Sequence, residues 1–235
     1  MKDQFYDKYV SSGQADNAEN DNVPVPYFDF LFDHFFKDRH RDIRILDIGC
    51  GSGDLLLYLK RRSFTALHGI ELSKEQVELA YKRDLHEVVS GDLMEYVKSS
   101  ETAFFDVIIA KDILEHLELN ELFLLVGELK RILKKGGTIV GHVPNANGIF
   151  GMKIRYGDIT HAAAFNEKSL SQLFRTVGFE HIRVVEDRPR SANLLKKWFR
   201  GCMWSLLTFR YRLINYIESG EKKIALSRNI TFFVN

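Results

Sequence analysis

The sequence predicts an α/β protein built as a single domain around a mostly parallel sheet. Two observations support this fold class. Short apolar runs alternate regularly with helix-like stretches from Ile43 onward, and the first run opens into a glycine-rich turn. Strands that alternate with helices at this spacing favour right-handed crossovers, which place helices on both faces of the sheet. The chain of 235 residues is long enough for one domain, 1–235, with a sizeable core.

Seven apolar runs are the predicted strands, at 43–49, 66–72, 87–92, 105–112, 138–144, 181–187 and 229–234. A helix over 55–60 is expected directly after the glycine-rich turn. Another is expected to end at Lys135, because cationic residues in a last turn followed by Gly136-Gly137 are typical of a helix C-terminus. A third helix is expected over 167–177, closed by Gly178.

Two segments lie outside this alternation. Residues 1–42 are expected to form a partial lid that includes a helix from about 27 to 36, or a helix that merely covers one sheet edge. Residues 188–228 separate the last two predicted strands. This insertion is too long for a hairpin loop, so we expect it to contain helical structure of its own.

The composition is that of an ordinary soluble protein and does not indicate a nucleic-acid partner. The 33 basic and 32 acidic residues leave a net charge of +1. Two cysteines, Cys50 and Cys202, are too few for a disulfide framework, which fits a reducing cytoplasm. No apolar leader follows Met1, and no apolar run approaches the roughly 18 to 20 residues of a membrane-spanning helix. We therefore expect a cytoplasmic location.

The run ILDIGCGSGD at 45–54 carries the most specific motif, three glycines spaced G-x-G-x-G. Glycine permits positive φ and leaves room for a ligand to approach the backbone. The helix after the turn would point its free amides at that ligand. Asp47 precedes the first glycine by two residues, and Glu71 follows at the end of the next run. A carboxylate roughly 20 residues past such a turn can accept hydrogen bonds from both hydroxyls of a ribose.

This motif resembles the first motif of class I S-adenosylmethionine-dependent methyltransferases, which is an acidic residue, any residue, then G-x-G-x-G. Nicotinamide-binding Rossmann domains instead use G-x-G-x-x-G. The resemblance implies a Rossmann-like seven-stranded sheet whose last strand is antiparallel, with S-adenosylmethionine as the cofactor. It places that cofactor at the carboxyl ends of the first four strands. The residues expected to bind it are Asp47, Gly49, Cys50, Gly51, Gly53, Glu71, Leu72, Asp92, Leu93, Ala110 and Lys111.

For several of these residues the alternative is a purely structural role. Asp92, for example, would then cap the following helix. The roles implied by the resemblance are more specific. The glycine backbone lies against the methionine part of the cofactor, and Glu71 binds the ribose. Leu72 packs on the adenine, and Asp92 accepts a hydrogen bond from its amino group.

Methyl transfer to a hydroxyl requires a group that removes a proton, and histidine is the favoured base because its pKa lies near neutrality. Two histidines are candidates. His116 ends the Leu114-Glu115-His116 string after the fourth strand, which resembles small-molecule methyltransferases of the ubiquinone-biosynthesis type. His161 lies in the segment YGDITHAAAF at 156–165.

That second segment, with VPN at 143–145 and GF at 178–179, resembles methyltransferases encoded among polysaccharide and O-antigen glycosyltransferases. The resemblance implies a small-molecule or glycan acceptor, including a lipid-linked precursor, with Asp158 orienting His161 as the base. His161 could instead tether the loop. A quinone or phenol served by His116, an amine that needs no base, and a non-catalytic module that binds the cofactor all remain open. No close set of metal ligands is apparent, so no metal is expected.

The segment 194–217 is rich in aromatic and aliphatic residues, and its charged residues are all basic. Such a helix can lie in the interface of an anionic membrane, which would place the protein peripherally at the inner membrane face. The alternatives are a helical pair packed on the sheet edge and a homodimer surface. Apolar residues are too dense for a single solvated helix, so we expect much of the segment to be buried.

Overall fold

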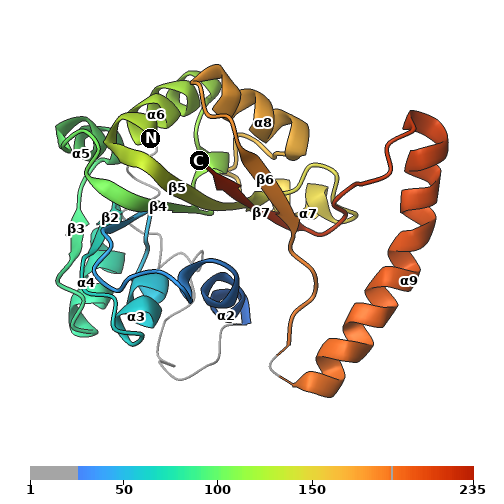
Figure 1. Cartoon of the computed structure of the whole chain (residues 1–235), viewed down its shortest axis with the longest axis horizontal. Helices are drawn as coiled ribbons and strands as arrows, with labels where there is room; N and C mark the ends of the chain where they lie inside the picture. The colour runs from blue at the N-terminus through green and yellow to red at the C-terminus, as the bar shows by residue number, and fades with distance from the viewer. Residues whose placement is uncertain (1–25, 192) are drawn as a thin grey trace.

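Seven strands form one sheet in the order β3-β2-β1-β4-β5-β7-β6 (Figure 1). The structure, a computed structural model, describes residues 26–191 and 193–235. Consecutive neighbours from β3 to β5 pair in parallel, and β7 pairs antiparallel with both β5 and β6. The predicted fold class, including its antiparallel last strand, is therefore confirmed. The strands are β1 (Ile45–Ile48), β2 (Leu67–Glu71), β3 (Val88–Ser90), β4 (Phe105–Lys111), β5 (Leu133–Pro144), β6 (Ile182–Glu186) and β7 (Asn229–Val234).

Helices cover both faces of this sheet (Figure 1). This cover is needed because the apolar side chains of the strands would otherwise face water. One core cluster packs α5 (Leu93–Ser99), α6 (Leu119–Ile132) and α8 (Glu167–Thr176) on one face. A second cluster packs α2 (Pro26–Leu31), α3 (Asp54–Lys60) and α4 (Lys74–Lys82) on the other. The remaining helical elements among the described residues are a π-helical turn η1 (Phe32–Phe36), a 3-10 turn η2 (Leu114–His116), α7 (Gly151–Arg155) and α9 (Leu194–Ser219).

The expected N-terminal helix is present as α2 followed directly by η1. Phe28, Leu31 and Phe36 are buried on the α3 side of the sheet. The hydroxyl of Tyr58 in α3 donates to Asp29 Oδ1 at 2.6 Å, which fixes α2 against α3. Residues 1–25 of the predicted lid lie outside the described residues.

The glycine pair Gly136-Gly137 does not end a helix, and this expectation was wrong. The helix α6 already ends at Ile132, and β5 begins at Leu133. Leu133 pairs with Phe105, and the register then shifts before Val107. A Cβ on Gly137 would lie 2.9 Å from the carbonyl oxygen of Asp106, and Gly136 has φ +78°. Gly137 therefore allows β4 and β5 to approach closely, and Gly136 supplies the positive φ beside it.

The insertion contains helical structure as expected, but as one helix of 26 residues, α9, rather than a pair. Throughout α9, which the structure describes completely, Thr208 is the one buried side chain. The expected burial of much of this segment is therefore not provided by the described part of this chain. None of the helices in residues 26–191 and 193–235 combines the length and apolarity needed to cross a bilayer.

Candidate active site

The candidate site lies at the carboxyl ends of β1, β2 and β4, where the chain order reverses on either side of β1. The three glycines after β1 adopt positive φ values of +64°, +57° and +76°. A Cβ on Gly49 would lie 2.8 Å from Ile113 Cδ1, and one on Gly53 would lie 2.6 Å from Leu85 Cδ1. The turn thus requires glycine for its backbone conformation, and a Cβ at Gly49 or Gly53 would also displace a neighbouring side chain.

Glu71 joins the end of β2 to this turn. Its Oε2 accepts a hydrogen bond from the backbone amide of Gly51 at 2.9 Å, and its Oε1 accepts one from Ser73 at 2.8 Å. Burial raises the pKa of Glu71 in spite of these bonds. Each carboxylate oxygen carries two lone pairs, so the fixed carboxylate can still accept hydrogen bonds from ribose hydroxyls.

Carboxylates converge beside the turn. Asp47 is buried in β1, and burial raises its pKa to about 7, although Lys111 opposes this shift. Lys111 forms an ion pair with Asp112, whose φ of +54° is rare outside glycine. Burial alone would raise the pKa of Asp112, but His142 and Lys111 outweigh it and hold that pKa well below its usual range. Such a cluster suits a ligand with a positive charge.

The other expected cofactor residues occupy neighbouring positions. Asp92 caps α5, since its Oδ1 accepts from the amide of Glu95 at 2.9 Å, and its contact with the adenine stays a prediction. Leu72 is exposed at the end of β2, Leu93 is half-buried on the core, and Ala110 is fully buried in β4. Cys50 fills the space beside Gly69, where an added Cβ would lie 2.8 Å from its Sγ, and burial raises the pKa of its thiol.

The expected pairing of Asp158 with His161 is not found. Asp158 Oδ1 instead accepts from the hydroxyl of Thr160 at 2.6 Å and from its amide at 2.8 Å. Burial would raise the pKa of Asp158, but the bonds from Thr160 lower it, so the group is an ionised acceptor. His161 Nδ1 lies 3.1 Å from the carbonyl oxygen of Ile154. The reason is that the Asx-type turn at Asp158 brings its carboxylate to the amide and hydroxyl of Thr160, two residues along the chain.

Thr160 connects Asp158 to His116, with Thr160 Oγ1 lying 2.8 Å from His116 Nδ1. Since the Thr160 hydroxyl donates to Asp158, its oxygen must accept from His116, which places the ring proton on Nδ1. The lone pair of His116 is then on Nε2. Burial, reinforced by the neighbouring His161, lowers the pKa of His116 to about 4, so the ring is neutral at pH 7.

Backbone hydrogen bonds hold the two predicted motifs together. The amides of Ala162 and Ala163 donate to the carbonyl oxygen of Glu115 at 2.6 and 3.0 Å. The loop after β5 therefore packs directly on η2. At the end of β5, Asn145 Nδ2 donates to the carbonyl oxygens of Ala225 and Ser227 at 2.9 and 2.8 Å, which anchors the segment returning from α9.

Glu115, His116 and His161 form a compact cluster, with side-chain ligand atoms all within 4.8 Å of one another. The two imidazole rings lie 4.7 Å apart at 69°. Glu115 Oε2 is buried without a hydrogen-bond partner, and burial raises the pKa of this carboxyl to about 8. The expectation that no close ligand set exists was therefore wrong, because the set forms only when the loop after β5 folds onto η2. These are ligand types that divalent transition metals accept.

Sequence reasoning missed a third histidine beside the site, His142. His142 in β5 lies with Nδ1 2.5 Å from Asp112 Oδ1 and with Nε2 3.4 Å from Asp187 Oδ2. The ring of Tyr27 packs 4.8 Å from that of His142. The available signal was a polar residue inside an apolar run that forms a central strand.

Comparison with known proteins agrees with this architecture. Residues 22–184 match the methyltransferase domain family. The chain is 28% identical over 212 residues to a probable fatty acid methyltransferase of Pseudomonas putida, covering 83% of this chain and 54% of that protein. It is 31% identical over 202 residues to 27-O-demethylrifamycin SV methyltransferase of Amycolatopsis mediterranei, covering 79% of this chain and 70% of the relative. It thus spans about half the length of the first relative.

Among solved structures, phosphoethanolamine N-methyltransferase 2 of Haemonchus contortus, in complex with S-adenosyl-L-methionine, superposes with a TM-score of 0.66. The alignment has 19% identity and covers 97% of this chain and 59% of the other. The fold and site thus define a Rossmann-like methyltransferase architecture. The chain belongs to the methyltransferase domain family.

Proposed function

We propose that this protein is an S-adenosylmethionine-dependent methyltransferase that methylates a hydroxyl group of a sugar or other small molecule in envelope glycan biosynthesis. The observation that carries the proposal is the free Nε2 lone pair of His116, oriented by Thr160 and Asp158. It lies on η2, directly after the strand end that carries Lys111 and Asp112. A neutral base next to a site that suits a cationic cofactor matches O-methylation.

Each part of the site would have a separate role in the reaction. S-adenosylmethionine, when bound, supplies an electrophilic methyl group. Glu71 and the glycine turn would hold its ribose and methionine parts, and Asp47 would offset its positive charge. His116 Nε2 would take the proton of the acceptor hydroxyl as that oxygen receives the methyl group, and the departing cofactor product would leave from the glycine turn. The hydrogen bond from His116 Nδ1–H to Thr160, which itself donates to Asp158, would stabilise the resulting imidazolium.

The acceptor class rests on the D-x-T-H segment and its resemblance to glycan methyltransferases. A cytoplasmic enzyme acting on a nucleotide-linked or lipid-linked sugar fits that resemblance. The name of the rifamycin relative specifies an O-methyl transfer, which favours a hydroxyl over an amine. A quinone or phenol would be served by the same base and is the second candidate, favoured by the resemblance of the Leu114-Glu115-His116 string to methyltransferases of the ubiquinone-biosynthesis type.

The test uses the purified chain with radiolabelled S-adenosylmethionine and three acceptor sets: lipid-linked or nucleotide-linked sugars, catechols, and primary amines. Label is expected in a sugar hydroxyl and should be lost with His116→Ala. Label confined to amines and undiminished in that variant would overturn the assignment. Calorimetry should detect both S-adenosylmethionine and S-adenosylhomocysteine but not NAD. Cofactor at 100 times its dissociation constant should stabilise the fold by about 2.7 kcal/mol, and the absence of heat with either sulfur nucleotide would exclude the cofactor.

A further inference from the structure

The helix α9 faces the protein with its polar side and faces outward with its apolar side. The residues turned toward the body follow helical spacing and include the half-buried and buried positions Gly201, Trp204, Thr208, Arg212 and Asn215. A helix that packed on its own domain would show the reverse arrangement. The density of apolar residues therefore indicates a side of α9 that becomes buried, but no other part of the described chain covers it.

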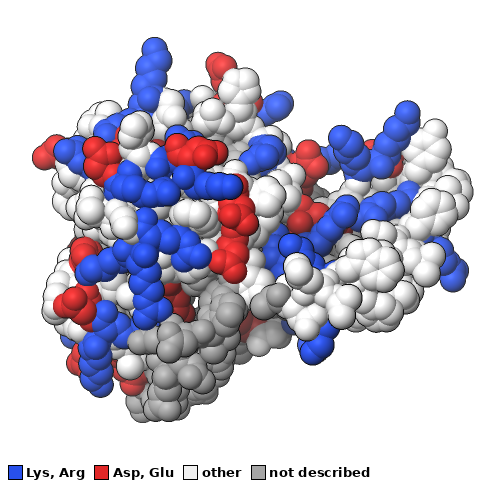
Figure 2. All heavy atoms as spheres, turned by 60° about the horizontal axis from the view of Figure 1, so that its bottom comes forward, with Lys and Arg blue, Asp and Glu red and all other residues white. Residues whose placement is uncertain are grey.

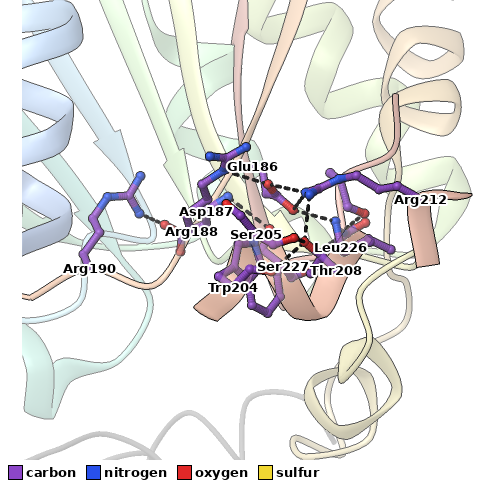
Figure 3. Close-up of polar contacts among 12 residues, drawn as sticks. Glu186, Asp187, Arg188, Arg190, Trp204, Ser205, Thr208, Arg212, Leu226 and Ser227 are labelled. Carbon is purple, nitrogen blue, oxygen red and sulfur yellow. Dashed lines mark hydrogen bonds and ion pairs between the residues drawn. The ribbon is translucent and has the colours of Figure 1, made fainter. Parts of the chain in front are cut away.

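Polar contacts fasten the inner side of α9 to the sheet (Figure 3). Arg212 Nη2 lies 3.1 and 3.0 Å from the two carboxylate oxygens of Glu186 in β6. Arg212 Nη1 also donates to Thr208 Oγ1 at 2.7 Å. The amide of Leu226 donates to Glu186 Oε1 at 2.9 Å, so the segment that returns from α9 shares the same carboxylate. These contacts fix which side of the helix points away.

The outward side carries a continuous apolar stripe. Leu195 and Ile217, near its two ends, are 80% and 75% exposed, and Leu206 between them is 67% exposed. Helical spacing places Phe199 and Leu213 on the same side. Further exposed large apolar side chains widen it on either side: Trp198, Met203, Phe209, Ile214 and Tyr216. So large an apolar surface on one element indicates a binding partner.

Charge identifies that partner. The helix has five basic residues, Lys196, Lys197, Arg200, Arg210 and Arg212, and one acid, Glu218. Figure 2 shows lysine and arginine side chains along this helix, at the right, beside a broad uncharged surface. Packing α9 of one copy against α9 of a second copy would bring basic side chains of both copies together with few acids to offset them. An anionic lipid surface offers both apolar depth and opposite charge.

We propose that α9 is an interfacial membrane anchor that binds anionic lipid, with its stripe of apolar residues among the acyl chains. Lys196 and Arg210, both exposed, would lie against the headgroups, since long basic side chains can reach them from an apolar face. Lys197, exposed on the body-facing side near the start of α9, would add longer-range attraction to the same surface at low salt. This surface does not depend on which acceptor is methylated. A lipid-linked acceptor would nevertheless be delivered to the same membrane.

The experiment is sedimentation of the full chain with vesicles of phosphatidylglycerol and phosphatidylcholine, compared with phosphatidylcholine alone. The wild type should sediment with the anionic vesicles at low salt and remain in the supernatant with the neutral ones. Replacing Lys196, Lys197 and Arg210 with glutamine should weaken binding about 100-fold, because each charge near the surface contributes about 1 kcal/mol. Arg200 is left intact because its Nη1 donates to the Arg190 carbonyl oxygen.

A matched control replaces three exposed lysines on other elements, Lys82, Lys98 and Lys135, with glutamine. This variant has the same net charge as the first and should bind vesicles like the wild type. Leu206→Ser with Ile217→Ser tests the apolar stripe at constant charge and should weaken binding at least tenfold, since about 1.4 kcal/mol corresponds to tenfold. Circular dichroism on each variant establishes that α9 remains folded.

Three outcomes would overturn the proposal. The wild type could stay in the supernatant with anionic vesicles, or both triple variants could lose binding equally, which would mean that only net charge matters. Sedimentation velocity without lipid could instead detect a dimer that Leu206→Ser with Ile217→Ser dissociates, in which case a second copy covers the stripe. Unchanged methyl transfer to a soluble acceptor in these variants would separate failure of the anchor from failure of the proposed activity.

Discussion

The hydroxyl oxygen of Thr160 lies 2.8 Å from His116 Nδ1 and 2.6 Å from Asp158 Oδ1, so one side chain links the two motifs. This relationship supports the proposal that His116, and not His161, is the base. Under the same proposal, Thr160 and Asp158 together orient the imidazole.

We expect His116→Ala to lower turnover roughly 100-fold or more while changing the dissociation constant of S-adenosylmethionine by less than about threefold. The reason is that His116 would handle the acceptor proton and not the cofactor. Single-turnover kinetics and calorimetry measure the two quantities separately. His161→Ala is the matched control and should retain most of its turnover. The opposite ranking of the two variants would return the base to the loop after β5.

Thr160→Val should lower turnover by less than His116→Ala, and Thr160→Ser should restore most of it, because serine keeps the hydroxyl that links Asp158 to the ring. Equal losses in both Thr160 variants would indicate a loop-packing role instead.

The pH profile of turnover provides an independent test. The folded pKa of His116 is about 4, below its ordinary value of 6.5, because of burial first and His161 second. The ring therefore keeps its lone pair down to about pH 5, and turnover at saturating cofactor should be flat from pH 8 to about 5.5 as far as this group is concerned. A decline centred near pH 6.5 would point to a more exposed histidine as the base.

Asp47 should make the affinity for the cofactor depend on pH between about 6 and 8. Its folded pKa of about 7 means that much of it is protonated at pH 6 and most is ionised at pH 8. A cationic cofactor should therefore bind more tightly as the pH rises through 7, and Asp47→Asn should flatten that dependence. Calorimetric titrations at pH 6, 7 and 8 measure the effect, and a wild type with pH-independent affinity would exclude it.

The same carboxyl has a consequence for stability without cofactor. Because the folded pKa exceeds the ordinary value of 3.8, the folded state holds more protons than the unfolded state between about pH 4 and 7. The contribution of Asp47 to stability therefore falls as the pH rises through this window. Asp47→Asn should raise the melting temperature at pH 8 and have little effect near pH 4.

The cluster of Glu115, His116 and His161 is the place to test metal dependence. With His116 acting as a base, removing divalent ions with a chelator should leave turnover unchanged. Elemental analysis of the purified protein accompanies the assay. If activity is lost and one divalent ion restores it, and if Glu115→Gln abolishes ion binding, the cluster is a metal site and the proton is removed from a metal-bound acceptor.

The parts of the fold that could be predicted depend on residues close together in sequence. The glycine turn and the strand that precedes it fall where the 45–54 run predicts them, since backbone conformation and apolar periodicity are local properties. The partner of Asp158 was missed because it depends on how the loop after β5 turns on η2. The cluster of Glu115, His116 and His161 was missed for the same reason. For α9 the composition was informative, but nothing local specifies which side of a helix meets the body.

Asn145 holds the insertion through the carbonyl oxygens of Ala225 and Ser227, which exist whatever side chains follow. This part of the attachment does not depend on side chains of the insertion, whereas the orientation of α9 depends on the ion pair of Arg212 with Glu186. Substitutions in α9 can therefore change its exposed surface while this anchor at the end of β5 keeps its backbone partners.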